Sequence, residues 1–421
     1  MKRILVINQY FPPDTSATAR VAEGLVRGLA DRFHVTVLAG RPSYDPSERH
    51  PYYLFRRRRE EWGAIERMGS SAGDRRRMFW RAANYLSYTL LAFFRALTSR
   101  ADAYLAMSDP PLAGLIAWTA GRIRRRPYVY NVQDLHPDMA LASGLIRRGP
   151  FVRVWEALHR RALRGAGRVI VLGDDMRRRV VAKGVDPARV AVVRDGAVLS
   201  PAAPPDPAVV RQLRGPFKFV VLHAGNLGHS GAWETLIGAA RALEGTGTGF
   251  VFVGGGARRE EVERLAEGLS NVRFQPFRPA GEIPSVMAAG DLHVVTIRRG
   301  LEGLVVPSKL YEILAAGRPV LAAAPEESDA ARIVREWDCG FVADPEDSSA
   351  VAEAVRRAFA DPGGLADMGR RSRLAAERFD RKSEVERFAG VVEEVFSDIR
   401  SWGHCEEALR PTKQPPVSSS R

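Results

Sequence analysis

The stretch Pro307-Ser308-Lys309-Leu310-Tyr311-Glu312 runs directly into the apolar segment Ile313-Leu-Ala-Ala-Gly317. It follows an apolar run and a glycine-containing loop, a pattern that predicts a helix opening behind a strand. Proline is favoured in the first turn of a helix, where its missing N–H costs no hydrogen bond. The free amides of that turn and the positive end of the helix dipole together form a site for an anion.

Two charged side chains indicate what this anion site could hold. Lys309 supplies a point charge for a phosphate, and Glu312, one turn further on, can accept two hydroxyl hydrogen bonds. A diphosphate next to a diol describes a nucleotide sugar. An ordinary amphipathic helix with a solvated Lys and Glu explains the same residues, so the rest of the chain has to decide between the two interpretations.

Length and composition favour two folded domains. A chain of 421 residues is too long for one ordinary core, and its 45% hydrophobic content and seven Trp are normal for a globular protein. Its two cysteines, Cys339 and Cys405, match no metal or redox spacing, which indicates a reducing compartment and no structural zinc. We find no signal peptide and no stretch of roughly 18 apolar residues. We therefore expect a cytoplasmic protein.

The net charge of +14 is placed unevenly. Most arginine runs lie in the first half: Arg56–Arg59, Arg75–Arg77, Arg122 with Arg124–Arg126, Arg147–Arg148 and Arg160–Arg161. Such a field attracts polyanions. Between two of these runs, residues 78–97 have a helical period, many aromatics and flanking arginines, which is typical of a helix in a membrane interface, where each nearby Arg adds about 1 kcal/mol. A buried helix of the first domain is the alternative. We find no nucleic-acid-binding motif, so the expected surface partner is an anionic membrane, on the inner face of the cell membrane.

Short apolar runs alternate with helical patterns in both halves of the chain. The runs are Arg3–Tyr10, His34–Ala39, Ala103–Met107, Tyr128–Val132 and Arg168–Leu172, then Lys218–His223, Phe250–Val253, Val272–Phe274, Leu292–Ile297, Val320–Ala323 and Gly340–Ala343. This alternation predicts an α/β fold of two Rossmann-like domains that face each other across a cleft. We expect an acceptor-binding domain over residues 1–200, a nucleotide-sugar-binding domain over 216–384 and a disordered tail over 403–421.

Loops that follow strands are expected to line the cleft. In the first domain, the small residues Thr15, Ser16 and Ala17 let backbone approach an acceptor, and Ser108 follows a later strand. In the loop of residues 131–138, Asp134 and His136 are candidates to orient an acceptor hydroxyl or to stabilise developing charge. Residues of these types on a loop also often just satisfy backbone groups.

Glycine loops in the second domain complete the candidate site. Gly225, Asn226 and Gly228 stand between a strand and a helix, where main-chain N–H groups suit a phosphate. Gly255 lies in a tight turn, Gly254–Gly256, that is expected to lie beside the nucleotide. A dinucleotide oxidoreductase is disfavoured because no acidic residue ends a following strand in position to hold an adenosine ribose.

Five motifs in this order resemble those of the family 4 glycosyltransferases of GT-B fold, in particular the colanic-acid and O-antigen N-acetylfucosaminyl transferase branch. They are Tyr10–Pro13, Gln133–Asp138, Ala224–Gly228, Val253–Gly256 and Val306–Glu312. The resemblance runs from Ile4 to about Phe396. It implies a retaining transfer from a nucleotide sugar, expected to be a UDP-sugar, with no cofactor and no required metal. It also implies that a helix over residues 385–400 packs back on the first domain.

Within the resemblance, Lys309 is expected to contact the diphosphate and to be catalytic together with Asp134 and His136. The donor is expected to meet the following residues: Gly225, Asn226, Gly228, Gly255, Pro307, Ser308, Lys309, Leu310 and, on the ribose, Glu312. Thr15, Ser16, Ala17 and Ser108 are expected to meet the acceptor.

The chain departs from the family pattern at several positions. The usual pair of glutamates eight residues apart would need a carboxylate at 304, where this chain has Leu304, and the role of Glu302 stays open. Asn226 and Gly231 replace a basic pair, which leaves Lys309 as the main diphosphate contact, with Arg298 or Arg299 as helpers. Ser108 stands where a cleft histidine is usual.

We therefore expect a retaining hexosyl- or N-acetylhexosaminyltransferase that acts on a polyprenyl-diphosphate-linked saccharide in bacterial surface polysaccharide synthesis, such as that of an O-antigen or a capsule. Two alternatives remain open. One is a sugar-nucleotide 2-epimerase of the same two-domain shape. The other is a non-catalytic nucleotide-sugar-binding partner in a polysaccharide assembly complex.

Overall fold

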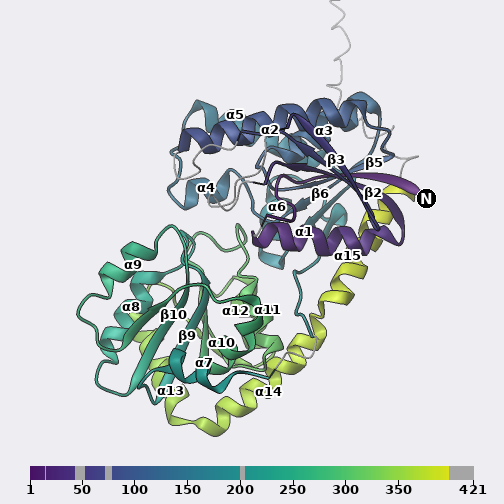
Figure 1. The fold of residues 1–421 in the computed structure, drawn as a ribbon. Coiled ribbons are helices and arrows are strands. Elements are labelled where there is room, and N and C mark those ends of the chain that lie inside the picture. The colour runs from purple at the N-terminus through teal and green to yellow at the C-terminus, as the bar shows by residue number, and fades with distance from the viewer. Residues whose placement is uncertain (15, 43–52, 72–77, 200–203, 398–421) are drawn as a thin grey trace, which may run out of the picture. The chain divides into compact units, whose positions relative to one another are not determined.

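The computed structural model describes residues 1–14, 16–42, 53–71, 78–199 and 204–397, and its strands form two sheets (Figure 1). The first sheet has the order β3-β4-β2-β1-β5-β6-β7-β8 and the second has the order β11-β10-β9-β12-β13-β14. The strands of the first sheet are β1 (Lys2–Ile7), β2 (Phe33–Gly40), β3 (Phe55–Glu60), β4 (Gly63–Met68), β5 (Ala103–Met107), β6 (Tyr128–Val132), β7 (Arg168–Val171) and β8 (Val190–Val192). Those of the second are β9 (Phe219–Asn226), β10 (Thr248–Gly255), β11 (Val272–Gln275), β12 (Leu292–Thr296), β13 (Val320–Ala323) and β14 (Gly340–Ala343).

Helices connect the strands. They are α1 (Ala17–Ala30), α2 (Met78–Thr98), α3 (Ala113–Arg124), α4 (Asp138–Ala142), α5 (Pro150–Arg164), α6 (Asp174–Ala182), α7 (Pro207–Arg214), α8 (Trp233–Ala242), α9 (Arg259–Leu265), α10 (Ile283–Ala289), α11 (Lys309–Ala315), α12 (Asp329–Glu336), α13 (Ser348–Ala360), α14 (Pro362–Arg378) and α15 (Arg381–Ser397). The chain thus alternates strand and helix in both halves, and the predicted α/β class is confirmed.

The central strands run parallel and are buried on both faces. β1 pairs in parallel with β2 and β5, and β9 pairs in parallel with β10 and β12. Every residue of β5, β6 and β12 is buried, as expected when helices cover both faces of a parallel sheet. This explains why these strands could be read from continuous apolar runs rather than from alternation.

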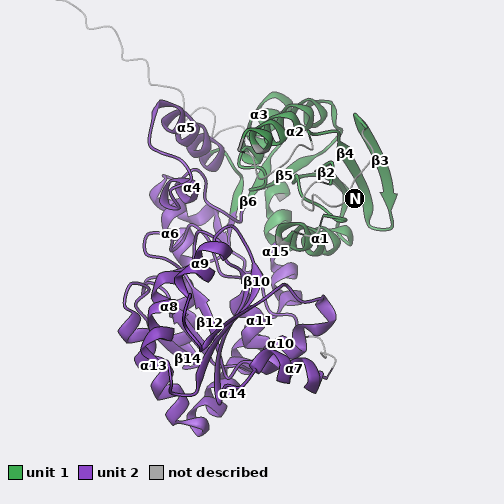
Figure 2. Ribbon diagram, turned by 60° about the vertical axis from the view of Figure 1, so that its left-hand side comes forward, with its two compact units in different colours: residues 1–130, 165–169, 389–421 green, residues 131–164, 170–388 purple. Residues whose placement is uncertain are grey.

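The chain divides into two compact units (Figure 2). Unit 1 comprises Met1–Tyr130, Gly165–Val169 and Ala389–Arg421, and unit 2 comprises Asn131–Arg164 and Ile170–Phe388. The expected domain boundaries at residues 200 and 216 remain a prediction. The expected disordered tail at 403–421 lies outside the described residues.

The end of α15 is held within unit 1 by one ring contact and two ion pairs. Phe396 stacks on Phe33 with ring centroids 5.4 Å apart. Glu393 pairs with Arg32 at 2.8 Å, and Glu394 pairs with Arg168 at 2.9 Å. Residues from both ends of the chain therefore build unit 1.

The strands β3 and β4 form an antiparallel hairpin that the sequence pattern did not predict. The run Arg56–Arg59 lies in β3, although it has no alternation of apolar and polar residues. Period-two hydrophobicity is the signal by which a strand is recognised, and an exposed edge strand of arginines lacks it. The hairpin is the main element missed by the sequence analysis.

Candidate active site

The carboxyl-terminal ends of β9 and β10 form one wall of the candidate site in unit 2. The parallel register places Gly254 beside Gly225 and Gly255 beside Asn226, and the Leu227 amide donates to the Gly255 carbonyl at 2.7 Å. A Cβ atom at position 254 would lie 1.9 Å from the Gly225 carbonyl oxygen, so this close approach requires glycine. Three residues expected to bind the donor, Gly225, Asn226 and Gly255, therefore lie together.

Packing accounts for the other glycines of this region. A Cβ on Gly228 would lie 2.8 Å from Asn226 Nδ2, and one on Gly256 would lie 2.3 Å from Asn226 Oδ1. A Cβ on Gly231 would lie 2.3 Å from the ring of Trp233, whose Nε1 donates to the Gly228 carbonyl at 2.7 Å. The glycines are thus needed to make room for the side chains of Asn226 and Trp233. The predicted contact of Gly228 with the donor remains a prediction.

Lys309 lies against this glycine corner. Its Cγ and Cε atoms lie 3.5 and 3.6 Å from the place that a Cβ on Gly225 would take. Its Nζ donates to Glu312 Oε2 at 2.8 Å, and the two side chains are 35% and 43% exposed. The cation expected to bind a diphosphate is therefore paired with the carboxylate expected to bind a ribose, and both are accessible.

The helix α11 begins at Lys309, so Pro307 and Ser308 precede it. This differs from the expectation that the proline lies inside the first turn. The amides of Leu310 and Tyr311 donate to the carbonyls of Pro307 and Ser308 at 3.0 and 3.2 Å, so these two amides are used within the turn. Leu310 is buried, so its side chain is not available to a nucleotide sugar, and its predicted contact with the donor remains a prediction.

His223 is a further polar residue at this corner that the sequence analysis did not single out. It lies two residues before Gly225 on β9, so both face the same side of the sheet. Its Nδ1 donates to the Val294 carbonyl at 3.3 Å, while Nε2 meets no hydrogen-bond partner among the described residues. Burial lowers the pKa of His223 to about 4, and the positive charge of Lys309 adds to this effect. A histidine within an apolar run was the signal that could have found it.

The loop of residues 300–304 contacts the segment that carries two expected catalytic residues, Asp134 and His136. The Leu135 amide donates to the Leu304 carbonyl at 3.1 Å. The His136 ring is buried and stacks on Trp155, with ring centroids 6.1 Å apart. The backbone contact places Asp134 and His136 in unit 2 beside the loop that precedes Lys309, and their catalytic roles remain predictions.

The carboxylate of Glu302 is used inside this loop. It accepts hydrogen bonds from Arg179 and from the Gly300 amide, both at 2.7 Å. Leu304, which stands at the position of the family's usual glutamate, is buried at 1% exposure. Glu302 therefore shapes the turn and holds Arg179, and Leu304 belongs to the core.

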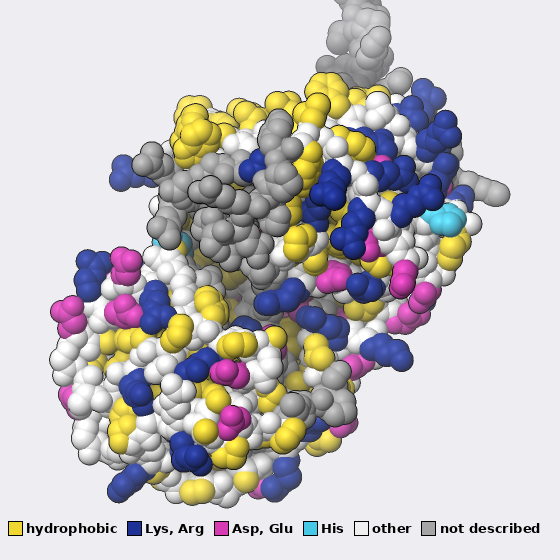
Figure 3. Space-filling model, viewed as in Figure 1, with side chains coloured by type: hydrophobic (Ala, Val, Ile, Leu, Met, Phe, Trp, Pro, Cys, Tyr) yellow, Lys and Arg dark blue, Asp and Glu magenta, His cyan; other side chains and the backbone are white. Residues whose placement is uncertain are grey.

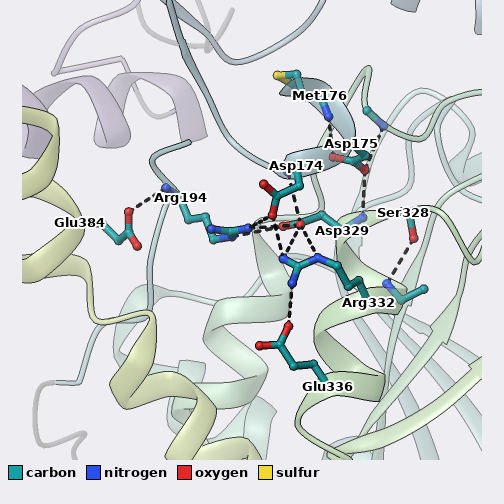
Figure 4. Close-up of polar contacts among 11 residues, drawn as sticks. Asp174, Asp175, Met176, Arg194, Ser328, Asp329, Arg332, Glu336 and Glu384 are labelled. Atoms are coloured by element: carbon teal, nitrogen blue, oxygen red, sulfur yellow. Dashed lines mark hydrogen bonds and ion pairs between the residues drawn. The ribbon is translucent and has the colours of Figure 1, made fainter. Parts of the chain in front are cut away.

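A network of ion pairs and hydrogen bonds holds the loop of residues 300–304 through Asp175 (Figure 4). Asp175 Oδ2 accepts from the amides of Gly303 and Asp329 at 3.1 and 2.9 Å. Arg194 pairs with Asp329 at 3.2 Å and with Asp174 at 2.9 Å. Burial on its own would raise the pKa of Asp329, but the charge of Arg194 outweighs it and keeps that pKa below its usual value. The network joins the starts of α6 and α12 to the loop that precedes α11.

The expected acceptor-binding residues lie in unit 1. Ser16 is the N-cap of α1, and its Oγ accepts from the Ala19 amide at 3.1 Å, which gives it a structural role. Ala17 begins that helix, and Thr15 lies outside the described residues. Ser108 is buried directly after β5. The contact of these residues with an acceptor remains a prediction.

The two arginines expected to help Lys309 have other partners, while Arg259 donates to the Gly254 carbonyl at the glycine corner itself. Arg299 pairs with Asp344 at 2.6 Å and with Glu346 at 2.9 Å, and Arg298 donates to the Ala142 carbonyl at 3.1 Å. Within the described ranges, no three His, Cys, Asp or Glu side chains are grouped in a way that could hold a metal ion. Lys309 therefore stays the leading diphosphate candidate.

Two doubly wound α/β sheets, with glycine loops at the strand ends of the second, are the architecture of the GT-B fold. The family model described as "Glycosyl transferase 4-like domain" matches residues 16–196, and the one described as "Glycosyl transferases group 1" matches residues 218–361. The chain belongs to the family 4 glycosyltransferases of GT-B fold, as its five motifs indicated.

Two curated bacterial proteins are similar over nearly the whole chain. The "Putative colanic acid biosynthesis glycosyl transferase WcaI" of Escherichia coli strain K12 is 24% identical over 415 residues, covering 94% of this chain and 100% of that protein. The "Probable glycosyltransferase WbjE" of Pseudomonas aeruginosa is 24% identical over 421 residues, covering 95% and 100%. The crystal structure of Anabaena Alr3699/HepE in complex with UDP has a TM-score of 0.65 at 20% identity, covering 94% and 100%. That likeness shows the fold.

Proposed function

We propose that the chain transfers a hexosyl or N-acetylhexosaminyl group, with retention, from a nucleotide sugar to a polyprenyl-diphosphate-linked saccharide in the synthesis of a bacterial surface polysaccharide. The observation that carries the proposal is the Lys309–Glu312 pair beside Gly225, at the carboxyl ends of β9 and β10. Ligands of open α/β sheets bind at such strand ends. The printed names of the relatives support it: WcaI is assigned to colanic acid synthesis, and HepE was crystallised with UDP.

Donor binding would replace the internal ion pair with ligand contacts. The Lys309 ammonium donates hydrogen bonds to the diphosphate, and the ribose hydroxyls donate to the two carboxylate oxygens of Glu312. This exchange costs little, because an exposed Lys–Glu pair contributes only about 0–1 kcal/mol. The positive charge that the leaving diphosphate requires then comes from Lys309, so the proposal needs no metal.

The proposed chemical step needs no protein nucleophile. The bond from the anomeric carbon to the diphosphate breaks while the bond to the acceptor oxygen forms on the same face of the sugar. The acceptor proton passes to the departing diphosphate. Asp134 and His136 orient the acceptor hydroxyl, and Lys309 stabilises the charge that develops on the leaving group.

The helix α2 supports a lipid-linked acceptor. One face packs into unit 1 through Asn84, Tyr88, Ala92 and Ala96, all at most 1% exposed. The other face exposes large apolar side chains: Phe79, Leu86, Leu90 and Phe94, which are 51–73% exposed. Apolar side chains appear along the upper edge of Figure 3, over α2 and α3. None of the helices in the described part of the chain is long and apolar enough to span a bilayer. We propose that this stripe lies in the inner membrane interface.

A non-catalytic donor-binding role is the second candidate. Its specific support is that Leu304 replaces the usual acid and is buried, while Glu302 is engaged by Arg179. A chain of this kind would bind a nucleotide sugar at the Lys309 corner and transfer nothing.

The test is the transfer of labelled sugar from a panel of UDP-, GDP- and dTDP-sugars into a membrane lipid extract. Lys309→Ala is the test variant, and Lys218→Ala is the matched control because Lys218 is exposed just before the amino end of the same strand, β9. We expect label in lipid from one donor, lost in Lys309→Ala and kept in Lys218→Ala.

The other outcomes separate the alternatives. Donor binding without transfer to any acceptor would favour the non-catalytic role. Interconversion of nucleotide sugars without an acceptor would favour an epimerase. Equal transfer by Lys309→Ala and the control would refute the assigned role of Lys309.

A further inference from the structure

The hairpin of β3 and β4 forms one wall of a pocket in unit 1 that the donor site does not use. The pocket has a volume of about 450 Å³, within the usual range for small-ligand sites. Its lining residues are Phe11, Pro12, Pro13, Glu23, Arg27, Pro42, Tyr53, Arg56, Arg58, Glu60, Trp62, Ile65 and Arg67. Four arginines and two glutamates leave this lining with a net formal charge of +2.

The two faces of the hairpin differ in charge pairing. Arg57 is opposite Glu66, and the two pair at 3.7 Å on the face away from the pocket. On the pocket face, Arg56 is opposite Arg67. Like charges directly opposite each other destabilise an antiparallel pair. Glu66 is shared with Arg95 of α2, which pairs with it at 2.7 Å. The position opposite Arg57 therefore holds a carboxylate, whereas the position opposite Arg56 holds a second cation, which favours an anion on the pocket face.

Ion pairs neutralise only half of the pocket's cations. Arg27 pairs with Glu23 at 2.8 Å, and Arg58 pairs with Glu60 at 2.8 Å. Within the described residues, Arg56 and Arg67 form no ion pair with a carboxylate. Two positive side chains therefore share this part of the pocket without a carboxylate of their own.

Arg67 is half-buried and held in place by backbone oxygens. Its Nη1 donates to the Gly40 carbonyl at 3.0 Å, and its Nη2 donates to the Phe11 carbonyl at 3.3 Å and to the Pro12 carbonyl. Burial lowers the pKa of Arg67, and the charges of Arg58 and Arg56 lower it further, while Tyr53 and Asp14 oppose the fall. The guanidinium stays charged in this setting, because an arginine pKa lies far above neutral pH.

The rest of the pocket is apolar. The rings of Phe11 and Trp62 lie 5.7 Å apart in a tilted arrangement, and prolines and Ile65 continue this wall. The same chain segment leads from Pro13 to Ser16, one of the expected acceptor-binding residues. The pocket thus combines two guanidinium groups that have no carboxylate partner with aromatic and aliphatic walls, and it adjoins the loop predicted to meet the acceptor.

We propose that this pocket binds the diphosphate of a lipid-linked acceptor, with Arg56 donating to the phosphate oxygens, Arg67 adding positive charge, and the Phe11–Trp62 wall against the first part of the isoprenoid chain. The exposed Arg56 guanidinium can donate two parallel hydrogen bonds to phosphate oxygens. Arg67, whose Nη atoms donate to backbone carbonyls, contributes its positive charge. The Lys and Arg side chains gathered over the region of β3 in Figure 3 favour the approach of such an anion. The proposal rests on the acceptor class named under the proposed function and adds the residues that recognise it.

The test measures binding of farnesyl diphosphate, farnesol and inorganic pyrophosphate to the full chain by calorimetry. Arg56→Gln is the test variant, and Arg59→Gln is the matched control, because both side chains are exposed on β3 and Arg59 is absent from the pocket lining. We expect the full chain to bind farnesyl diphosphate at least tenfold more tightly than pyrophosphate or farnesol. We also expect Arg56→Gln, but not Arg59→Gln, to weaken binding of farnesyl diphosphate at least tenfold.

Binding that is equal in the two variants would overturn the proposal. Farnesyl diphosphate binding no more tightly than pyrophosphate would overturn its lipid part and indicate a soluble anion. Thermal unfolding of each variant shows whether it is folded, and Arg67→Gln repeats the test at the second pocket cation that has no carboxylate partner. If the full chain binds farnesyl diphosphate but transfers no sugar, the proposed function is contradicted and the proposed pocket is still supported. If Arg56→Gln transfers sugar with an unchanged KM for the acceptor, the proposed pocket is contradicted and the proposed function is still supported.

Discussion

The positive groups of the two units differ in how they are compensated. In unit 2, Lys309 is neutralised by Glu312 at 2.8 Å, and the neighbouring His223 is kept uncharged by burial, with its pKa at about 4. In unit 1, Arg56 and Arg67 are opposite each other across a hairpin, and no carboxylate of the described chain pairs with either. One site carries its own counter-charge, and the other leaves it to a ligand.

If both proposed sites bind anions, this difference corresponds to two kinds of anion recognition in one chain. At Lys309 a ligand must displace an internal partner, so binding there can be coupled to the rearrangement that a reaction needs. At Arg56 the charge is already exposed, so an anion gains attraction as it approaches. We infer that the first arrangement suits a leaving group and that the second suits a group that is held but not transformed.

The largest effect is expected from removing the cation proposed to bind the diphosphate in unit 2, Lys309. Lys309→Ala should lower kcat/KM for sugar transfer about 100-fold, and by at least tenfold, because a group that stabilises leaving-group charge is typically worth this much. Initial rates with the best donor from the panel measure this. Circular dichroism and thermal unfolding check that the fold is intact. Near-normal kinetics in a folded Lys309→Ala protein would show that Lys309 does not stabilise the leaving group, and the proposed contrast between the two units would fail.

Acid should destabilise unit 2 through histidines that are buried in their neutral form. Burial lowers the pKa of His159 to about 3 and those of His223 and His293 to about 4. The unfolded chain binds these protons near pH 6.5, so stability is complete above that value and is lost as the pH falls toward 4. At about pH 5 each of these histidines should cost about 2 kcal/mol.

Hydrogen exchange at pH 7 and pH 5, corrected for intrinsic rates, measures this loss in each unit separately. The arginines of the unit 1 pocket do not titrate in this range, so protection around β3 and β4 should depend less on pH. His223→Asn should remove about one third of the acid effect in unit 2. Equal acid sensitivity of both units would contradict the assignment of the acid effect to the buried histidines of unit 2.

A smaller effect is expected from the carboxylate partner of Lys309. Glu312→Gln removes the ribose contact but leaves a side chain of the same shape, so affinity for the nucleoside diphosphate should fall about tenfold, as for one hydrogen bond to a charged group. Turnover at saturating donor should change less than affinity. Calorimetric titration gives the affinity, with Glu327→Gln as the control because Glu327 is exposed on a different loop. Unchanged affinity would count against Glu312 as the ribose ligand.

The smallest effect concerns salt. Arg56 is exposed, so raising the salt from about 50 to about 200 mM should weaken pyrophosphate binding in unit 1 about threefold, because added ions screen exposed charges. Binding of a nucleoside diphosphate at the partly buried Lys309 corner should respond less. Isotherms at four salt concentrations test this, and a steeper dependence at Lys309 would reverse the proposed contrast.

The sequence predicted the parallel strands well because burial on both faces makes them continuous apolar runs. Ala103–Met107, Tyr128–Val132 and Val320–Ala323 agree with β5, β6 and β13 at both ends. It missed the hairpin because an exposed strand of arginines has no hydrophobic period. The register that sets Arg56 against Arg67 and Arg57 against Glu66 is a pairing between strands, and no single-strand pattern contains it.

The candidate site was predicted in part, for a similar reason. The glycine corner and Lys309 were found because loop motifs are contiguous in sequence. His223 was missed, because its place in the site depends on its proximity to Lys309 of α11, which is distant in sequence. The use of Glu302 by Arg179 was also hidden, since these residues are far apart in the chain and meet only through the loop anchored by Asp175. Contacts between distant segments were what the sequence could not show.

The central claim is that Lys309 exchanges Glu312 for the diphosphate of a nucleotide-sugar donor. A crystal structure of the chain with UDP tests it most directly. The account predicts diphosphate oxygens within hydrogen-bonding distance of Lys309 Nζ and ribose hydroxyls on Glu312, with the 2.8 Å ion pair broken. UDP bound elsewhere, with the Lys309–Glu312 pair intact, would contradict it.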